Sequence, residues 1–584
     1  MEQADAVAAT TTTEEPIDGA AAPAGEHRPL GARATAVGRT YWPLLVVAVV
    51  ALGVRLWAVY AWMPECTPSQ AQNRTVLTEC YAIGGDAYHY NDLAAHIADG
   101  RGFTILSYAT FTDVDVADHP PAYPLFLALL DVLGLTEMNE HRLALCFVGT
   151  AAAVTLGLVG WRLGGRATGV VAGLVAATYP GFWMSEAYYM SESLFVLFVA
   201  LALLAVYRFW RRPGWMNAIL AGAAGGLAWL TRGEAAVVLG LTMVGFVLFS
   251  KREALWRKVK LGLVACAVCI AMMVPWVAYN LYRFPEPIYI AATGTAFALN
   301  SCDEVWYGDA AGFYSFGCLY RTTEQVRLED GEVTDAGLRR KAVEYQRANL
   351  DRYPAVVAIR IGRLFGGYEV YDTYQRNVLA EGRREDGVKG QQIVYYALLP
   401  LGAVGLYVLR RRRVPLTPLV APVLATAATV AGTFAIYRYR LTADTALIVA
   451  GSAGAVALVR WLVGRARGRP VALGLDPRGE PEWAAVAAGA AAGSAERPDE
   501  PVAVPVAATP AVVDTAPAPL APPAGDRPAV ASAAAPGGAA RGRRPDTAPL
   551  PSLDDLLSFG GTTSSASEQR GTDEVGDATA ANDR

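Results

Sequence analysis

Long apolar runs alternate with polar segments through the middle of the chain. An α-helix needs about 18 or more apolar residues to cross a hydrocarbon core roughly 30 Å thick, and several runs have that length. The runs lie at 42–62, 120–135, 143–161, 167–183, 190–207, 216–231, 235–250, 259–281, 391–409, 416–436 and 441–463. This pattern predicts an all-α integral membrane protein with a polytopic membrane domain at 41–463.

Basic residues between the runs predict which of them cross. Lys and Arg in short loops stay on the cytoplasmic side of a membrane. The basic clusters are Arg33/Arg39, Arg162/Arg166, Arg208/Arg211/Arg212, Lys251 to Lys260, Arg410 to Arg413, and Arg460/Arg465/Arg467. All of them fall on one side only if 120–135 does not cross. We therefore expect 120–135 to be an amphipathic or re-entrant helix at the outer surface.

About ten transmembrane helices then remain, with both termini cytoplasmic. Two large segments face outward, 63–141 and 283–390. The first apolar run is too long for the core of a cleavable signal peptide, so it reads as an uncleaved first helix. The segments 1–40 and 464–584 contain no apolar run, and the second is rich in Ala and Pro. Such compositions bury too little apolar surface to fold, so both segments are predicted to be disordered cytoplasmic tails.

Composition adds two limits. The net charge is −4 over 584 residues, and basic residues are not interleaved with aromatic ones, which argues against a nucleic-acid partner. Arginine far outnumbers lysine, as is typical of a bacterium with GC-rich DNA.

The cysteines fit the predicted orientation. Each outer segment holds one pair, Cys66 with Cys80 and Cys302 with Cys318, in the compartment where disulfides persist. We expect two disulfides; the alternative is four free thiols.

The first outer segment carries the motif G-G-D-A-Y-H-Y-N-D-L at 84–93, which predicts a short helix that ends at Gly100. Asp86 stands at the start of this helix. It could cap the helix, or it could be a general base that takes a proton from an acceptor hydroxyl. Tyr90 belongs to the same motif. His89 and His96 share one helical face and, with Asp92 and Asp99, could bind a metal ion; a solvated polar face is the alternative.

Other ionisable residues gather at the predicted outer ends of helices, where such groups are costly and therefore functional candidates. Arg438 and Arg440 lie on the side where positive charge is unfavoured, which suggests an anionic ligand such as phosphate, or else an interfacial anchor. Arg55 lies deep in the first run and could snorkel outward or point into an internal cavity. The remaining candidates are Asp118, His119, Glu192, Arg232 and Glu234.

Taken in order, these motifs resemble the polytopic glycosyltransferases of superfamily C, in particular family 39, which includes protein mannosyltransferases and lipid A aminoarabinose transferases. The matching motifs are G-G-D-A-Y-H-Y (84–90), D-H-P-P-A-Y-P-L-F-L-A-L (118–129), S-E-S-L-F-V-L-F (191–198), G-L-A-W-L-T-R-G-E (226–234), V-P-W-V-A-Y-N (274–280) and R-Y-R-L (438–441).

The resemblance implies an enzyme that moves a sugar from a polyprenyl-phosphate donor to an extracytoplasmic acceptor by inverting displacement. It implies that Asp86 is the catalytic base and Glu192 a second acidic residue. Asp118 and His119 would lie near the carrier phosphate, and His119, Arg438 or Arg440 would stabilise the departing phosphate. It names no certain cofactor, although a divalent metal ion is possible.

The chain lacks the soluble carbohydrate-binding domain of the best-known branches, so the acceptor stays open: an envelope lipid, a glycan or a protein. Two other classes of protein compete with this interpretation. A lipid or polysaccharide transporter or flippase would favour internal repeats and broken helices near the midplane, and neither is evident. A membrane scaffold would explain the tails but not the acidic and aromatic outer segments.

Overall fold

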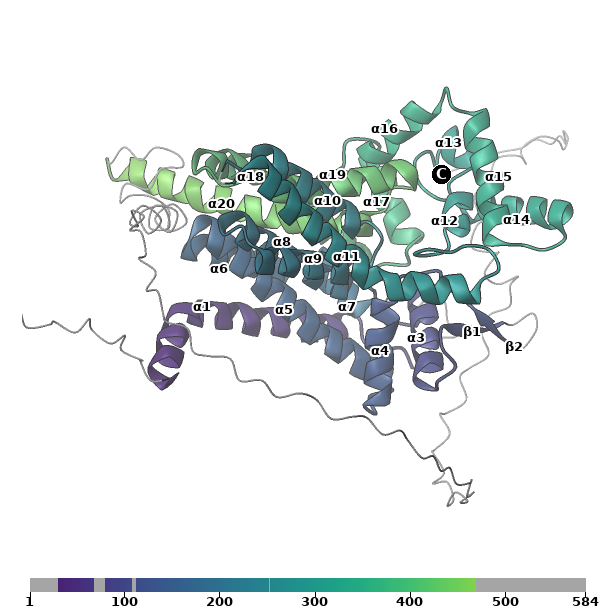
Figure 1. The fold of residues 1–584 in the computed structure, drawn as a ribbon, viewed down its shortest axis with the longest axis horizontal. Helices are drawn as coiled ribbons and strands as arrows, with labels where there is room; N and C mark the ends of the chain where they lie inside the picture. Colours follow the sequence, from purple (N-terminus) through teal and green to yellow (C-terminus); the bar gives the residue numbers. More distant parts are fainter. Residues whose placement is uncertain (1–29, 68–78, 108–111, 252, 469–584) are drawn as a thin grey trace, which may run out of the picture.

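The computed structural model describes residues 30–67, 79–107, 112–251 and 253–468 (Figure 1). Within them the protein is a bundle of long helices with a cap of short helices at one end. Of the predicted tails, 1–40 and 464–584, residues 1–29 and 469–584 lie outside the described residues. Residues 30–40, predicted to belong to the first tail, are the start of a helix, and residues 464–466, predicted to belong to the second, are the end of another.

The bundle consists of helices that coincide with the predicted apolar runs. They are α1 (Leu30–Trp57), α5 (Met138–Gly164), α6 (Arg166–Thr178), α7 (Pro180–Ala187), α8 (Glu192–Arg211), α9 (Trp215–Trp229), α10 (Ala235–Phe249), α11 (Leu255–Arg283), α18 (Glu385–Arg411), α19 (Thr417–Gly432) and α20 (Leu441–Ala466). A π-helical turn, η1 (Ala58–Trp62), extends α1, and a short 3-10 helix, η3 (Tyr437–Arg440), leads into α20.

Length separates these helices into two groups. Six helical segments are long and apolar enough to cross a membrane, and the α6–α7 pair, bent by 44°, gives a seventh if it is one span. Helices α9, α10 and α19 have 15, 15 and 16 residues. At 1.5 Å per residue they measure about 22 to 24 Å, which is less than a hydrocarbon core of roughly 30 Å. The integral membrane fold is confirmed, whereas the count of ten crossings stays a prediction.

The run at 120–135 forms only α4 (Ala122–Val132), about 16 Å long and too short to cross. Tyr123 and Leu127 are buried against the protein, and Leu125 and Leu129 on the other face are exposed. Exposed leucines on a short helix beside a membrane bundle suit the lipid interface, as predicted.

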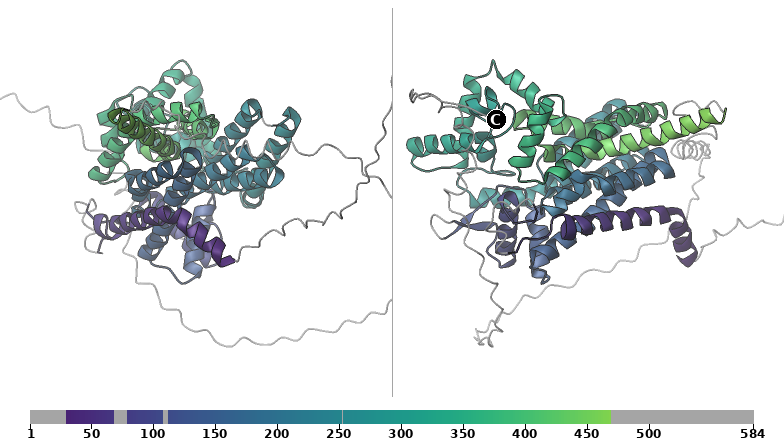
Figure 2. Two further views of the ribbon diagram at one scale, coloured as in Figure 1. Left: turned by 90° about the vertical axis from the view of Figure 1, so that its left-hand side faces the viewer. Right: turned by 180° about the vertical axis from the view of Figure 1, so that it is seen from behind.

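The two predicted outer segments form the cap. The first contains α3 (Gly85–Ala98), the strands β1 (Thr104–Ser107) and β2 (Thr112–Asp115), and α4. The second contains α12 (Gly294–Ala298), α13 (Asp303–Trp306), α14 (Phe316–Asp330), α15 (Asp335–Ala348), α16 (Tyr353–Leu364) and α17 (Val370–Leu379). The views agree that α3, β1, β2 and α12 to α17 gather at one end of the bundle (Figures 1 and 2).

Both predicted disulfides are present. Cys66 and Cys80 are bonded with a Cα–Cα distance of 4.9 Å, and Cys302 and Cys318 with 5.5 Å. The first bond holds the chain just before α3, where the Cys66 N–H also donates to the Tyr81 carbonyl (2.9 Å). It therefore fixes the segment that leads into the G-G-D motif.

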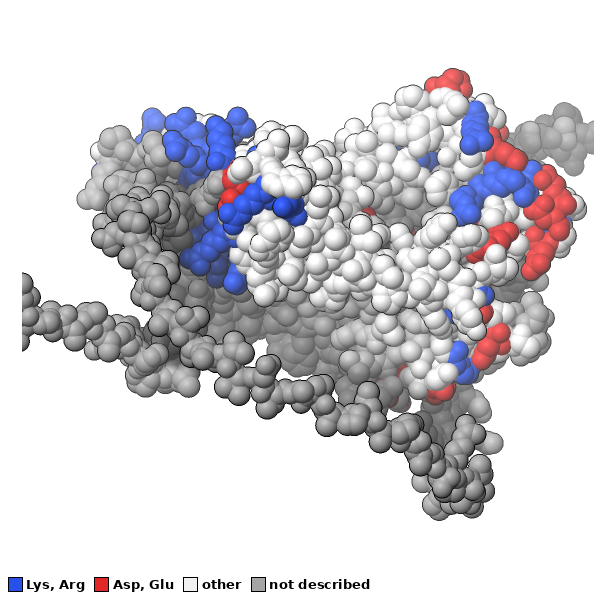
Figure 3. All heavy atoms as spheres, viewed as in Figure 1, with Lys and Arg blue, Asp and Glu red and all other residues white. Residues whose placement is uncertain are grey.

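Charge is divided between the two ends of the bundle. Lys and Arg gather at the end opposite the cap, the flank between the ends is almost free of charge, and acidic and basic residues mix on the cap (Figure 3). The uncharged flank has the appearance expected for the part that lies in lipid. The basic end has the character of the cytoplasmic side.

The helices approach closely because small residues line their contacts. Gly157 and Gly160 of α5 face the backbone of α6 near Gly169, so a Cβ at Gly160 would lie 3.0 Å from the Thr168 carbonyl oxygen. Small residues let membrane helices gain van der Waals contact where no hydrophobic driving force exists.

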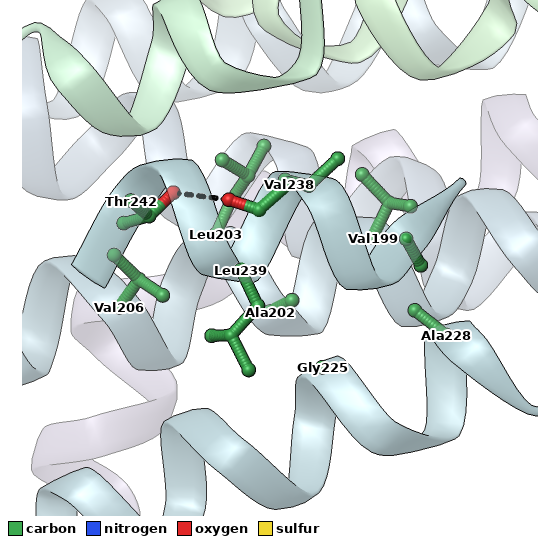
Figure 4. A pocket seen from close by; sticks show the side chains of 10 residues that line it. Val199, Ala202, Leu203, Val206, Gly225, Ala228, Val238, Leu239 and Thr242 are labelled. Atoms are coloured by element: carbon green, nitrogen blue, oxygen red, sulfur yellow. Dashed lines mark hydrogen bonds between the residues drawn. The ribbon is translucent and has the colours of Figure 1, made fainter. Parts of the chain in front are cut away.

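An apolar cavity lies between α8, α9 and α10 (Figure 4). Its lining carries no charged side chain. The Thr242 hydroxyl at its edge already donates to the Val238 carbonyl (2.7 Å). This cavity therefore has no group suited to acid–base chemistry.

Candidate functional site

Arg438 joins carboxylates from three distant parts of the chain. It lies on η3, and its Nη1 donates to Asp86 Oδ2 of α3 at 2.7 Å. Its Nε lies 3.3 Å from Glu381 Oε2, in the turn before α18, and 3.9 Å from Glu192 Oε1. The Glu192 and Glu381 side chains are buried, whereas Asp86 keeps 35% of its side chain exposed. Of the three carboxylates, Asp86 is thus the one that an acceptor can reach.

A second arginine continues the same cluster. Arg232 lies in the turn between α9 and α10 and donates to Glu192 Oε1 (2.8 Å) and to Glu234 Oε1 (2.9 Å). Its guanidinium also stands 5.1 Å from the centre of the Tyr439 ring. Asp86, Glu192, Arg232, Glu234, Glu381 and Arg438 are called the ion cluster below.

The helix geometry around Asp86 decides between its two predicted roles. Gly85 has a φ of +54°, a conformation that favours glycine, and Gly84 rather than Asp86 is the N-cap of α3. The Asp86 carboxylate turns to Arg438 instead of closing the helix end. The geometry favours a role in the ion cluster over a role as a cap.

Burial alone would raise the pKa of Asp86, but the charge of Arg438 outweighs it and holds the pKa below its usual range. Asp86 is therefore ionised at neutral pH and can accept a proton. The same Arg438 contact makes it a weak base until the guanidinium finds another anion.

His119 lies beside the cluster, on the segment before α4. Its ring packs 4.7 Å from the Tyr90 ring, and its Nδ1 is buried without a hydrogen-bond partner among the described residues. Burial, only partly offset by Asp86, lowers the pKa of His119, so the ring is neutral at pH 7. The Tyr90 hydroxyl donates to Ser191 Oγ (3.2 Å), next to Glu192. His119 can thus donate or accept one proton but brings no positive charge.

Two arginines predicted from sequence lie away from the cluster. Arg440 is fully buried and contacts Asp444 (3.2 Å) and Gln392 (2.7 Å) inside the bundle. Arg55 is fully buried as well, 3.4 Å from Glu186. Arg55 therefore points inward rather than snorkelling, and both arginines hold helices together.

The histidines at 89 and 96 turn to different partners. His89 Nε2 lies 3.3 Å from Asp118 Oδ2, and His96 Nδ1 lies 3.0 Å from Thr104 Oγ1. Asp118 thus contacts His89, and among the described residues it makes no ion pair with the ion cluster. His96 Nε2 also lies 3.9 Å from Asp92 Oδ1, but among the described residues no third ligand atom joins this pair on α3.

Within the described ranges, the one group of three or more His, Cys, Asp or Glu ligand atoms close enough to share an ion is Cys302, Glu304 and Cys318. Two of these are joined in a disulfide, so their sulfur atoms are not thiolate ligands. A metal requirement stays a prediction.

Sequence reasoning missed Glu381, Tyr314 and Arg383. Tyr314 donates to Glu381 Oε1 (3.1 Å), which holds that carboxylate toward Arg438. Arg383, two residues further on, is buried in the same region. No motif marks these three positions. The one feature of the sequence that could have pointed to them is that the second outer segment is rich in both acidic and basic residues.

The chain was compared with known proteins. Residues 118–279 match the family model described as dolichyl-phosphate-mannose-protein mannosyltransferase. No match was found among curated proteins.

Solved structures with similarity include the archaeal oligosaccharyltransferase AglB from Archaeoglobus fulgidus, in complex with an inhibitory peptide and a dolichol-phosphate. It is 15% identical with a TM-score of 0.43, covering 78% of this chain and 55% of that one. ArnT from Cupriavidus metallidurans, bound to undecaprenyl phosphate, is 15% identical with a TM-score of 0.34, covering 74% of this chain and 81% of that one. The chain thus spans about half the length of the oligosaccharyltransferase.

The family match covers the segment that contributes His119, Glu192, Arg232 and Glu234 to the site. Over residues 118–279 it confirms the resemblance of this chain to the polytopic glycosyltransferases of superfamily C.

Proposed function

We propose that this protein transfers a sugar from a polyprenyl-phosphate donor to an acceptor on the outer side of the membrane, with inversion at the sugar carbon. The ion cluster is its catalytic site. The observation that carries the proposal is the contact between Asp86, a partly exposed carboxylate, and Arg438, at the capped end of a membrane bundle. The family match over residues 118–279 supports the same reaction class.

The residues divide the reaction between them. An acceptor hydroxyl attacks the anomeric carbon and gives its proton to Asp86. The bond from that carbon to the phosphate oxygen breaks, and its electron pair leaves with the lipid phosphate. Arg438 stabilises this charge, and Arg232 holds Glu192 in place beside it. Hydrogen-bond donors that are held where negative charge develops, in a site of low dielectric constant, supply much of an enzyme's rate enhancement.

Arg438 links the two halves of this reaction. While it contacts Asp86, the carboxylate is a weak base. A phosphate that draws Arg438 away restores basicity at the moment when a donor is bound. The free protein is thereby discouraged from activating water in the absence of donor.

The active site faces outside and both termini are cytoplasmic in this proposal. The distribution of Lys and Arg to the end away from the cap supports that orientation (Figure 3). Turnover measured with and without a chelator tests whether the reaction requires a divalent metal ion.

The experiment uses the full chain in lipid nanodiscs, labelled polyprenyl-phosphate sugars as donors and an envelope extract as the source of acceptor. Wild-type protein is compared with Asp86→Asn and with Asp99→Asn. Asp99 is a matched control because it follows α3 and leaves 58% of its side chain exposed. Label transfer by wild type and Asp99→Asn, but not by Asp86→Asn, is the expected result. Failure of wild type with every donor would reject the proposal.

A further inference from the structure

A cavity lies on the side of Arg438 that faces α17 and α18, next to its contact with Glu381. Its lining includes Glu381, Arg383, Gln391, Tyr437 and Arg438. Gln391 lies near the start of α18, so the cavity lies where the bundle meets the cap. In the proposed orientation this junction lies at the outer membrane surface, where lipid head groups are found.

Arg383 is unusual among the buried arginines. Each fully buried arginine donates at least one side-chain hydrogen bond: Arg440 donates to Gln392 (2.7 Å), for example, and Arg360 to the Ala431 carbonyl (2.8 Å). Arg383 is only 7% exposed, yet among the described residues no carboxylate lies within ion-pair distance and its Nη2 has no hydrogen-bond partner. The Arg383 guanidinium lies 5.5 Å from the centre of the Tyr188 ring. A ring face stabilises a buried cation less than a bound anion does, so a buried guanidinium with no carboxylate beside it marks a place where an anion can bind.

Two further donors around the cavity make no hydrogen bond among the described residues. They are Gln391 Nε2 and Arg438 Nε, the second of which is ion-paired with Glu381 Oε2 at 3.3 Å without a hydrogen bond. Each of these three nitrogen atoms carries hydrogens and no free acceptor lone pair. A ligand that hydrogen-bonds to all three nitrogen atoms must therefore offer several acceptor oxygen atoms.

The charged residues that line the cavity also favour a ligand with several oxygen atoms and a negative charge. Glu381 is the acidic member, and its oxygens are engaged by Tyr314 and Arg438. The Arg383 guanidinium contacts the Tyr188 ring but has no carboxylate within ion-pair distance among the described residues. Guanidinium groups recognise phosphate oxygens through paired N–H donors.

We propose that Arg383, Gln391 and Arg438 form a subsite for a phosphate monoester. The inference rests on the proposed function, in which the departing lipid carries that group. It assigns Arg383 and Gln391, which no motif marks, to holding the leaving phosphate after the sugar has moved. Arg438 then lies between the base on one side and the phosphate on the other.

Binding is measured without any transfer reaction, so it tests the subsite separately from the proposed function. Full-length protein in nanodiscs is titrated with a short-chain polyprenyl monophosphate, with the matching polyprenol, and with orthophosphate. The variants are Arg383→Met and Gln391→Met, which keep side-chain length and remove the donors. Arg327→Met is the control, since Arg327 lies on α14 with 60% of its side chain exposed.

We expect Arg383→Met to weaken phosphate binding about 10- to 100-fold, which corresponds to the loss of a charge-assisted hydrogen bond. Arg327→Met should leave phosphate binding unchanged. Gln391→Met should weaken binding and at the same time raise the melting temperature of the free protein, because it removes an unsatisfied buried donor. A merely structural glutamine would not show this opposite pair of effects.

The probes distinguish the source of the phosphate. Tight binding of the polyprenyl monophosphate, with weak binding of orthophosphate and polyprenol, identifies a lipid carrier. Equal binding of the two phosphates, still lost in Arg383→Met, identifies free phosphate as a ligand of the same subsite. If folded Arg383→Met and Gln391→Met both bind phosphate like wild type, the cavity holds only water and the proposal is wrong. Binding that follows the proposal without sugar transfer would reject the proposed function alone.

Discussion

Asp86→Asn is the most direct test of the assigned base. The substitution keeps the size of the side chain and removes its ability to take a proton. Loss of a general base typically lowers the rate about 10²- to 10⁴-fold, or about 2.7 to 5.4 kcal/mol at 1.36 kcal/mol per decade. We therefore expect kcat to fall by that factor.

Stability should change far less. Asp86 is more than a third exposed in its contact with Arg438, and exposed ion pairs contribute about 0 to 1 kcal/mol. Arg438 also keeps its contact with Glu381. The melting temperature of Asp86→Asn should accordingly stay close to that of wild type.

The pH profile gives an independent check. The pKa of Asp86 is lowered in the free protein, so the carboxylate stays ionised as pH falls through the ordinary range of aspartate. The acid limb of kcat/KM, which reports the free enzyme, should lie below that range. The acid limb of kcat, which reports the enzyme with donor bound, should lie at a higher pH than that of kcat/KM, because the bound phosphate draws Arg438 away from Asp86. Because the pKa of Asp86 is lower in the folded protein, its ionised form adds to the free energy of unfolding at any pH above the pKa of aspartate in the unfolded chain. This contribution is lost as the pH falls through the lower pKa of Asp86 in the folded protein.

Whether Asp86 is the catalytic base is decided with purified protein by three measurements: steady-state turnover, thermal unfolding and the pH profile. A kcat of Asp86→Asn within a few-fold of wild type, in folded protein with its true donor, would refute the assignment. Glu192 or Asp118 would then be the next candidate for the base.

Three further predictions concern the rest of the chain. Cysteines introduced at 137–140, just after α4, should react with an impermeant reagent added outside intact cells; protection there until the membrane is permeabilised would mean that α4 crosses. A chain truncated after residue 470 should insert and keep full turnover, and loss of turnover with normal insertion would give the tail a direct role. Gly149→Leu should lower the melting temperature, because a side chain there meets the buried Arg55–Glu186 pair, and by several degrees more than a leucine at an open helix position.

The helices of the bundle could be predicted because lipid imposes a simple pattern on sequence. Every span must be apolar for most of its length, and each predicted run did form a helix. The same reasoning found α3 from its Gly–Gly start and Gly100 end. It did not find β1 and β2, because short exposed strands such as Thr112–Asp115 have no buried face to leave a periodic signal.

The site was only half predictable for a related reason. Asp86, Glu192 and Arg232 follow from motifs, but Glu381 and Arg383 lie in the second outer segment without a motif. Their partners are set by how loops meet in space. Arg438 and Arg440 show the same limit, since they are two residues apart on a 3-10 turn and therefore face different ways, one into the cluster and the other into the bundle.

The contact between Asp86 and Arg438 also has a consequence for synthesis. The two residues are 352 positions apart, and Arg438 comes directly before the last helix. At about 5 to 20 residues per second, a ribosome takes roughly 20 to 70 s to add the arginine after the aspartate. During that time the nascent chain exposes a carboxylate without the group that would hold a leaving phosphate. If the proposed function holds, a half-made protein cannot consume lipid-linked sugar, and activity begins only when α20, the last helix of the described residues, has been inserted.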